Sequence, residues 1–149
     1  MNKEPAFWDA SALVPLCVHE IISPQARSYL RRFLPVVWWG SVLEVRSTVA
    51  RLHRTEHWGE VARNRALSGL NVLSRTWKEV PPTDELRVLA GSLLDVRVLR
   101  AADSLQLAAA LIWCDERPTR RSFVCADQRL SEAASSAGFS VVELSRGIS

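Results

Sequence analysis

The sequence predicts an α/β domain of three layers (α/β/α), with helices on both faces of a mostly parallel central sheet. Short β-branched and aromatic runs alternate with longer helical patterns, which is typical of parallel sheets with helical crossovers. The length of 149 residues is ordinary for one domain. With 48% hydrophobic and 23% charged residues, the composition excludes a disordered chain. We therefore expect a single domain over residues 1–149, with a core at residues 6–144.

The first part of the chain is predicted to form one strand and two helices. Residues 6–8 are an apolar run that ends at Asp9, as a short buried strand does. Residues 11–18 are predicted to form a short helix. A second helix is expected to begin at Pro24, because proline favours the first helical position, with Ser23 as its N-cap.

The next segments are predicted to form one strand and two long helices. Pro35 is expected to end the preceding helix, and the β-branched and aromatic run at residues 36–39 favours a buried strand. Apolar residues recur near helical spacing over residues 41–54 and again over residues 58–80, so each stretch is predicted to be a helix. A proline pair that begins at Pro81 ends the second of them.

The last part of the chain continues this alternation. Helices are predicted where capping residues precede helical patterns, and the alanine-rich helix should be central because it is mostly apolar. The short segment at residues 95–100 fits either a strand or a connector. The predicted helices span residues 83–94, 101–113 and 130–137, and the predicted strands span residues 122–126 and 139–144.

Four acidic residues are predicted to converge at one edge of this sheet. Each follows a strand or opens a helix, and in parallel α/β units these two positions share an edge where ligands bind. Asp95 lies close enough to this crevice to be a reserve candidate. The four acids are Asp9, Glu44, Asp103 and Asp127.

Four ionised carboxylates in one crevice repel one another, and a divalent cation removes that repulsion. Ligands that are all oxygen suit Mg²⁺ or Mn²⁺ rather than zinc. Such an ion can activate a water for attack on a phosphodiester and can stabilise the developing charge. The chain carries a net charge of +3, and only two of its 19 basic residues are lysines. Arginine suits bidentate phosphate contacts, so the pattern predicts a metal-dependent nuclease.

Each acid also has a purely structural interpretation, which stays open from the sequence. Ser41 and Glu44 have the spacing of a helix capping box, and Asp103 with Gln106 repeats that pattern. Asp127 precedes a helix and can serve as its cap. The arginine content likewise has an alternative explanation in genome composition.

Other functional classes lack their signals. The chain has no glycine-rich nucleotide loop and no G-x-S-x-G elbow for a serine hydrolase. The three cysteines form no C-x-x-C pair, so we expect buried, reduced thiols. No apolar run is long enough for a membrane helix, and the N-terminal residues lack the apolar region of a secretory signal. We therefore expect no membrane partner and a cytoplasmic location.

Four segments, in order along nearly the whole chain, resemble the PIN-domain ribonucleases, and most of all the VapC-type toxins of VapBC toxin–antitoxin pairs. FWDASALVPL is similar to the opening motif of that family, and SVLEVRSTVARL to its second motif, a glutamate on a helix. LRAADSLQLAAAL and FVCADQRLSEAASSAGF are the most specific matches.

The resemblance implies a Mg²⁺- or Mn²⁺-dependent endoribonuclease that forms a homodimer and is silenced by a cognate antitoxin. It implies that Asp9 and Asp103 are the main metal ligands, that Glu44 and Asp127 complete the pocket, and that the Ser11 hydroxyl supports the site.

This chain departs from the family pattern at three positions. Ala10 replaces a threonine, Gln106 replaces a frequent histidine, and Cys125 stands where threonine or serine is common. A lost hydroxyl at Cys125 can alter the hydrogen bonds that orient the ligands. Two other functions remain compatible with the sequence: a PIN-domain nuclease of RNA processing without a toxin role, and a non-catalytic α/β interaction domain.

Overall fold

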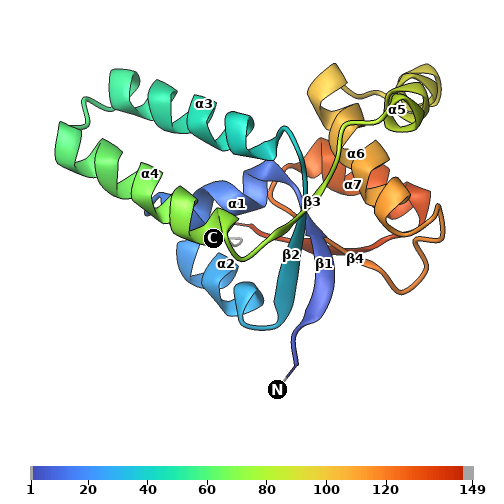
Figure 1. Ribbon diagram of the computed structural model, residues 1–149, viewed down its shortest axis with the longest axis horizontal. Coiled ribbons are helices and arrows are strands. Elements are labelled where there is room, and N and C mark those ends of the chain that lie inside the picture. Colours follow the sequence, from blue (N-terminus) through green and yellow to red (C-terminus); the bar gives the residue numbers. More distant parts are fainter. Residues whose placement is uncertain (1, 146–149) are drawn as a thin grey trace.

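A five-stranded parallel sheet forms the centre of the structure, a computed structural model that describes residues 2–145 (Figure 1). Every pair of neighbouring strands is parallel, which confirms the predicted class of sheet. The order across the sheet is β3-β2-β1-β4-β5. The strands are β1 (Glu4–Trp8), β2 (Phe33–Trp38), β3 (Lys78–Val80), β4 (Ser122–Cys125) and β5 (Ser140–Glu143).

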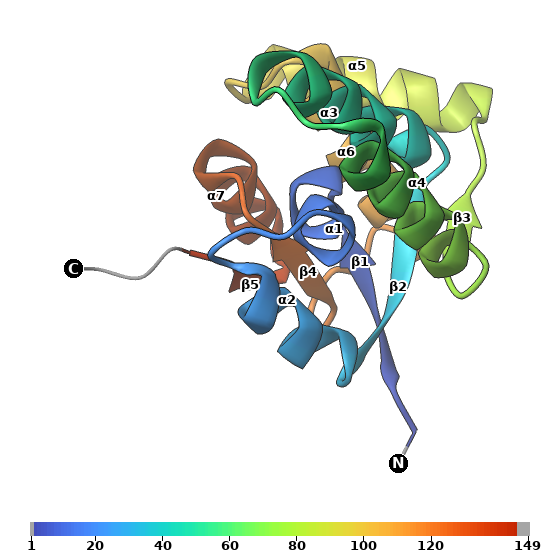
Figure 2. The same cartoon turned by 90° about the vertical axis from the view of Figure 1, so that its left-hand side faces the viewer.

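Helices cover both faces of this sheet, so the three-layer prediction is also confirmed (Figures 1 and 2). One hydrophobic cluster joins the sheet to the first four helices, and a second cluster joins it to the last three. The first set is α1 (Ala10–Cys17), α2 (Ser23–Leu30), α3 (Ser41–Thr55) and α4 (Glu60–Ser74). The second set is α5 (Asp84–Val96), α6 (Ala101–Trp113) and α7 (Gln128–Ala137).

The central strands are apolar on both faces because each face is covered. Successive side chains of a strand point to opposite faces. Accordingly Phe7 belongs to the cluster under α5–α7 and its neighbour Trp8 to the cluster under α1–α4, and both are fully buried. In the same way, Val36 belongs to the cluster under α5–α7 and Val37 to the cluster under α1–α4. This is why the strands have continuous apolar runs without a polar alternation.

Two predictions around α2 and β2 are wrong. Ser23 is not the N-cap of α2: that position is Ile22, and the Ser23 hydroxyl donates to the Val18 carbonyl. Pro35 does not end the helix, because α2 ends at Leu30 and Pro35 lies inside β2. The strand tolerates it because β3 first pairs with β2 at Val36, so at Pro35 the strand has a neighbour on one side only.

The single long helix predicted over residues 58–80 is also wrong. The helix α4 ends at Ser74, and Lys78–Val80 forms the edge strand β3. Trp77 and Val80 belong to the two buried clusters, which draws this segment onto the sheet. Residues 95–100, which fitted a strand or a connector, end α5 and connect it to α6.

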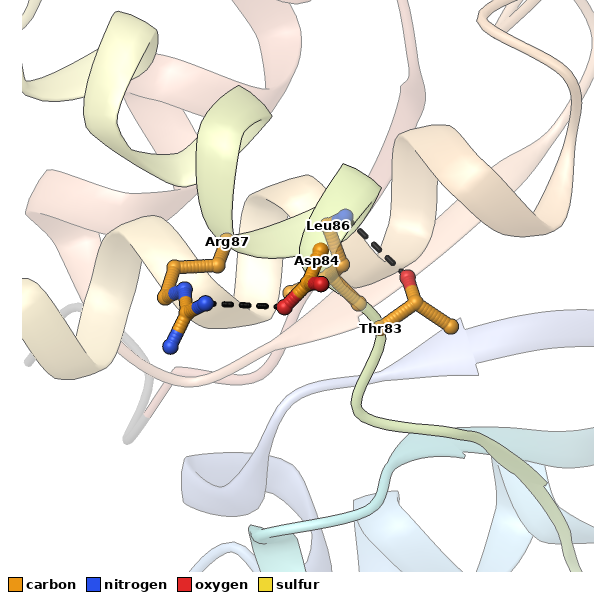
Figure 3. A network of polar contacts seen from close by, with 4 residues as sticks. All are labelled: Thr83, Asp84, Leu86 and Arg87. Atoms are coloured by element: carbon orange, nitrogen blue, oxygen red, sulfur yellow. Dashed lines mark hydrogen bonds and ion pairs between the residues drawn. The ribbon is translucent and has the colours of Figure 1, made fainter.

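The remaining helices follow the prediction closely. The structure gives α6 the predicted bounds, and most of its residues are buried. Thr83, where this helix is predicted to start, caps α5: its hydroxyl accepts from the Leu86 amide at 3.1 Å, and Arg87 pairs with Asp84 at 2.8 Å (Figure 3). The helix α7 ends at Ala137 and is capped by Gly138, whose φ of +115° is a conformation that favours glycine. Among residues 2–145, no helix combines the length and the apolar character needed to span a membrane.

Candidate metal centre

The four predicted acids line one pocket of about 360 Å³ at the carboxyl edge of the sheet. Each comes from a different segment: Asp9 follows β1, Glu44 lies in the first turn of α3, Asp103 in the first turn of α6, and Asp127 precedes α7. The Ser11 hydroxyl lines the same pocket. The reserve candidate Asp95 is exposed and does not line it.

Asp9 is the most buried of these acids, with 5% of its surface exposed. It caps α1, and its Oδ2 accepts from the Ser11 amide at 3.1 Å and from the Ser11 hydroxyl. Burial raises the pKa of Asp9 to about 6, the bonds from Ser11 oppose that shift, and the charges of Asp103 and Asp127 add to it. Ser11 Oγ also accepts from the Ala126 amide at 2.9 Å, so one hydroxyl links the ends of β1 and β4.

Glu44 is held by a side chain from another helix rather than by a capping box. The N-cap of α3 is Gly40, and Ser41 makes no side-chain bond to the start of the helix. Instead Gln106 Nε2 donates to Ser41 Oγ and to Glu44 Oε1, both at 3.0 Å. Burial, together with the charges of Asp9 and Asp103, raises the pKa of Glu44 to about 7, although the bond from Gln106 opposes the shift.

Asp103 and Asp127 form the more open side of the pocket. Asp127 does cap its helix, because Oδ1 accepts from the Leu130 amide at 2.9 Å, and it lines the pocket at the same time. Asp103 is not an N-cap, since that position of α6 is Arg100. Burial and the charge of Asp127 raise the pKa of Asp103, whereas Arg100 and Arg129 lower it.

Three solved structures share this architecture. PAE2754 from Pyrobaculum aerophilum matches with a TM-score of 0.62 and 17% identity, over 95% of this chain and 90% of that one. VapBC2 from Rickettsia felis, bound to a DNA fragment from their promoter, matches with a TM-score of 0.64 and 9% identity, over 94% and 98% of the two chains. FitAcB from Neisseria gonorrhoeae matches with a TM-score of 0.61 and 12% identity, over 95% of this chain and 97% of that one.

The chain has a PIN-like fold. At these identities the likeness concerns the fold alone. No family model matches the sequence, and no curated protein matches it. What the site does in this PIN-like fold must therefore be argued from its own residues.

The cysteine that departs from the PIN motif touches two of the acids. Cys125 is fully buried, and its thiol lies 3.7 Å from Asp9 Oδ2, 3.7 Å from Ser11 Oγ and 3.3 Å from the Asp127 carbonyl oxygen. Burial and the charge of Asp9 raise the pKa of this thiol to about 12, so it stays protonated and donates to its neighbours at neutral pH. It occupies the place of a hydroxyl as a weaker donor.

The sequence did not predict the role of Gln106 in the PIN-like site: it placed this residue in a capping pattern and marked it as a departure from the family's frequent histidine. Gln106 is 1% exposed, and Ser41 is fully buried. A buried amide requires hydrogen-bond partners. Those of Gln106 lie on another helix, α3: Ser41 is 65 positions away in the sequence, and Glu44 is 62 positions away. The available signal was a glutamine within the otherwise apolar run of residues 105–111.

The donor set of the PIN-like pocket fits a hard divalent cation. The lining side chains that can bind an ion offer oxygen only. Burial raises the pKa of Asp9, Glu44 and Asp103, and the charge of at least one neighbouring acid raises each of them further. Within residues 2–145, however, no three acidic, histidine or cysteine side chains are grouped tightly enough to hold an ion by themselves. Mg²⁺ keeps several waters, so it needs only one or two direct carboxylate contacts, with the others made through water.

Proposed function

We propose that this protein is a metal-dependent endoribonuclease and the toxin of a type II toxin–antitoxin pair. One observation carries the proposal: four carboxylates from four remote segments line one pocket at the carboxyl edge of the sheet. Neutral groups make the hydrogen bonds of these acids, and within residues 2–145 none of the four forms an ion pair, so no basic side chain neutralises their charge. A site that accumulates negative charge in this way is suited to bind a cation.

The side chains have distinct proposed roles. Asp9 and Asp103 are the main ligands of Mg²⁺ or Mn²⁺, and Glu44 and Asp127 complete the pocket by holding water around the ion. When bound, the ion activates a water and neutralises charge on the scissile phosphodiester. Ser11 fixes the orientation of Asp9 through two bonds to one oxygen, which leaves Oδ1 available. Gln106 fixes Glu44 in the same way.

The toxin role and the partners rest on fold similarity and the sequence motifs. One of the similar structures is VapBC2 bound to a DNA fragment from their promoter. We infer that this chain likewise pairs with an antitoxin, acts on RNA as a homodimer, and works in the cytoplasm.

The nuclease proposal is tested by cleavage of a single-stranded RNA by the purified protein with Mg²⁺. We expect cleavage that EDTA abolishes and that Asp9→Asn reduces to background. Asp95→Asn is the matched control, because it makes the same change at an exposed acid that does not line the pocket. Full cleavage by Asp9→Asn would overturn the mechanism.

The toxin role needs a separate experiment, because an RNA-processing nuclease would have the same site. Expression of the wild-type chain should arrest growth, and expression of Asp9→Asn should not. Co-expression of the small protein encoded beside this gene should restore growth. Metal-dependent cleavage without growth arrest would instead support the processing role.

A further inference from the structure

The acid pocket adjoins two larger hollows that share lining residues with it. One hollow, of about 660 Å³, shares Asp103 and Asp127 with it. The other, of about 490 Å³, shares Ser11 and Thr48 with it. Gln128 lines both of these hollows. A polymer bound at the carboxylates therefore has room to continue into either hollow.

The two hollows differ in charge. Arg100 and Arg129 line the larger one, together with Glu132 and the shared acids. No arginine or lysine lines the smaller one, whose charged residues are Glu20 and Glu143. Only the larger hollow therefore offers cations to an anionic ligand, and we call it the arginine hollow.

The placement of these two arginines does not serve the stability of the helices. Arg100 is the N-cap of α6, and Arg129 is the second residue of α7. A positive charge at the amino end of a helix is unfavourable, because that end is already positive. Both side chains are exposed, and within residues 2–145 neither forms an ion pair. Their charges lower the pKa of Asp103, and both arginines line the hollow that this acid shares with the acid pocket.

We propose that the arginine hollow is a subsite for one backbone phosphate of the RNA, beside the phosphate at the carboxylates, and that the smaller hollow holds no phosphate. This inference rests on the proposed function. Guanidinium groups bind phosphate oxygens in pairs, and two of them can share one phosphate. The acids that also line the hollow repel a phosphate, so the subsite works only when a divalent cation neutralises the wall it shares with the acid pocket.

An acidic peptide is the other ligand that two arginines could hold. The shared wall favours RNA, because Asp103 and Asp127 belong to the cleavage pocket as well as to the arginine hollow. A strand whose scissile phosphate lies at these acids must place a neighbouring nucleotide in one of the adjoining hollows, and only one of them carries positive charge.

The first test measures binding of a fluorescently labelled single-stranded RNA by anisotropy, with the acid pocket intact and with Ca²⁺ in place of Mg²⁺, so that the carboxylates keep a cation while its looser coordination suppresses cleavage. Arg100→Gln and Arg129→Gln should each weaken binding about tenfold. The double variant should lower the slope of log Kd against log salt by about 0.7, as expected for the loss of one phosphate contact on a single strand. Arg65→Gln, an exposed arginine of α4 that lines neither hollow, is the control and should bind like the parent.

A thermal melt excludes a folding defect in these variants. Both substitutions should leave Tm unchanged or raise it, because they remove a positive charge from the amino end of a helix. Unchanged RNA affinity in the double variant would overturn the subsite. So would tighter competition by a polyglutamate peptide than by an unlabelled RNA.

The second test locates the phosphate with the active protein. An uncharged methylphosphonate replaces the linkage on one side of the scissile bond or on the other. We expect kcat/KM to fall about tenfold for one side only, and this loss to vanish in the Arg100→Gln, Arg129→Gln double variant. Equal losses on both sides, or a loss that persists in the double variant, would overturn the subsite alone. Failure of the wild-type protein to cleave unmodified RNA would overturn the proposed function, and the subsite with it.

Discussion

The acid pocket has two unlike walls. The inner wall consists of Asp9 and Glu44, which lie at the starts of α1 and α3, on the face of the sheet that α1–α4 cover. The outer wall is Asp103 and Asp127, which lie at the starts of α6 and α7 on the other face of the sheet. Asp9 is buried and Glu44 is half-buried, and both have pKa values raised to about 6 and about 7. Asp127 is exposed, and burial together with the charge of Asp127 raises the pKa of Asp103, although Arg100 and Arg129 oppose that shift.

The partners of the two walls explain the difference. Neutral groups hold the inner wall: the Ser11 hydroxyl and amide at Asp9, and the Gln106 amide at Glu44. Neutral donors fix a carboxylate in place without cancelling its charge. The outer wall borders the arginine hollow and is open to solvent. We infer that the inner wall supplies Asp9 as a metal ligand fixed by neutral donors, and that the outer wall supplies the second ligand, Asp103, and also faces the substrate.

The largest expected difference between the walls is in catalysis. Asp9→Asn should lower kcat/KM by about 10³-fold, since it removes a charge that is well shielded from water, which corresponds to ~4 kcal/mol of transition-state stabilisation. Asp127→Asn should cost about tenfold, because this acid is solvated. Asparagine caps a helix as well as aspartate does, so α7 should stay intact in the second variant. Steady-state cleavage of one RNA by both variants measures the two losses of kcat/KM, and equal losses would contradict the distinction between the walls.

The second prediction concerns how Glu44 is positioned. Gln106→Ala removes the donor that holds Glu44 and leaves Ser41 without its partner. We expect the affinity for Mn²⁺ to fall by about 10–100-fold, which is typical when a group that orients a metal ligand is lost. Calorimetric titration with Mn²⁺ measures this directly, without any turnover.

Two further variants sharpen the test of Gln106. Gln25→Ala is a matched control, because Gln25 binds the Ser145 amide near the surface, far in sequence from the acids. Gln106→His, which restores the residue frequent in the family, should keep a donor and recover part of the affinity. If Gln106→Ala binds Mn²⁺ like the wild type, Glu44 needs no positioning and the inner wall is not preorganised.

Most of the fold could be predicted from the sequence, because the alternation of apolar runs and helical patterns is local. Residues 101–113 illustrate this: their alanine-rich pattern leaves little choice but a buried helix, and α6 has those bounds. The errors arose where tertiary contacts override local preference. Nothing local distinguishes Lys78–Val80 from the end of a helix, since its pairing partner is β2, some 40 residues earlier.

The site residues, like the fold, were predictable only where the signal is local in the sequence. Asp9 and Asp127 were predictable as charges that close apolar strands, and the parallel topology places them at the edge where the pocket lies. The capping patterns at Glu44 and Asp103 were misleading, because the spacing of a capping box does not reveal which way the side chains turn. The hydrogen bonds of Gln106 to α3 depend on how two helices pack, and the sequence alone does not contain that information.

A third prediction concerns the stability conferred by the ion. Mn²⁺ at a concentration 100 times its Kd should stabilise the wild type by about 2.7 kcal/mol, as for any ligand that binds only the folded state. Asp9→Asn should lose this gain, and Asp127→Asn should keep most of it. Thermal melts with and without Mn²⁺ measure the shift, and Asp95→Asn again serves as the neutral reference. Equal shifts in all three variants would place the ion elsewhere.

The smallest effect expected is the dependence of metal-free stability on pH. In the folded protein the pKa of Asp9 is about 6 instead of 3.8, and that of Glu44 about 7 instead of 4.5. Both groups hold protons more tightly in the folded state, so their contribution to stability is complete below pH 4 and is lost as pH rises through 6 and 7. In EDTA, the free energy of unfolding should fall by about 1–3 kcal/mol between pH 5 and pH 8.

Urea denaturation at a series of pH values tests whether the free energy of unfolding falls as pH rises. Variants of the acids then show which wall of the pocket causes the fall. Asp9→Asn removes one of the two titrations and should show a shallower fall than the wild type. Asp127→Asn should keep most of the fall, because the inner wall still titrates. A free energy of unfolding that rises with pH in EDTA would mean that other groups already compensate the inner carboxylates. The pocket would then have no excess negative charge, and the physical reason for a cation at this site would disappear.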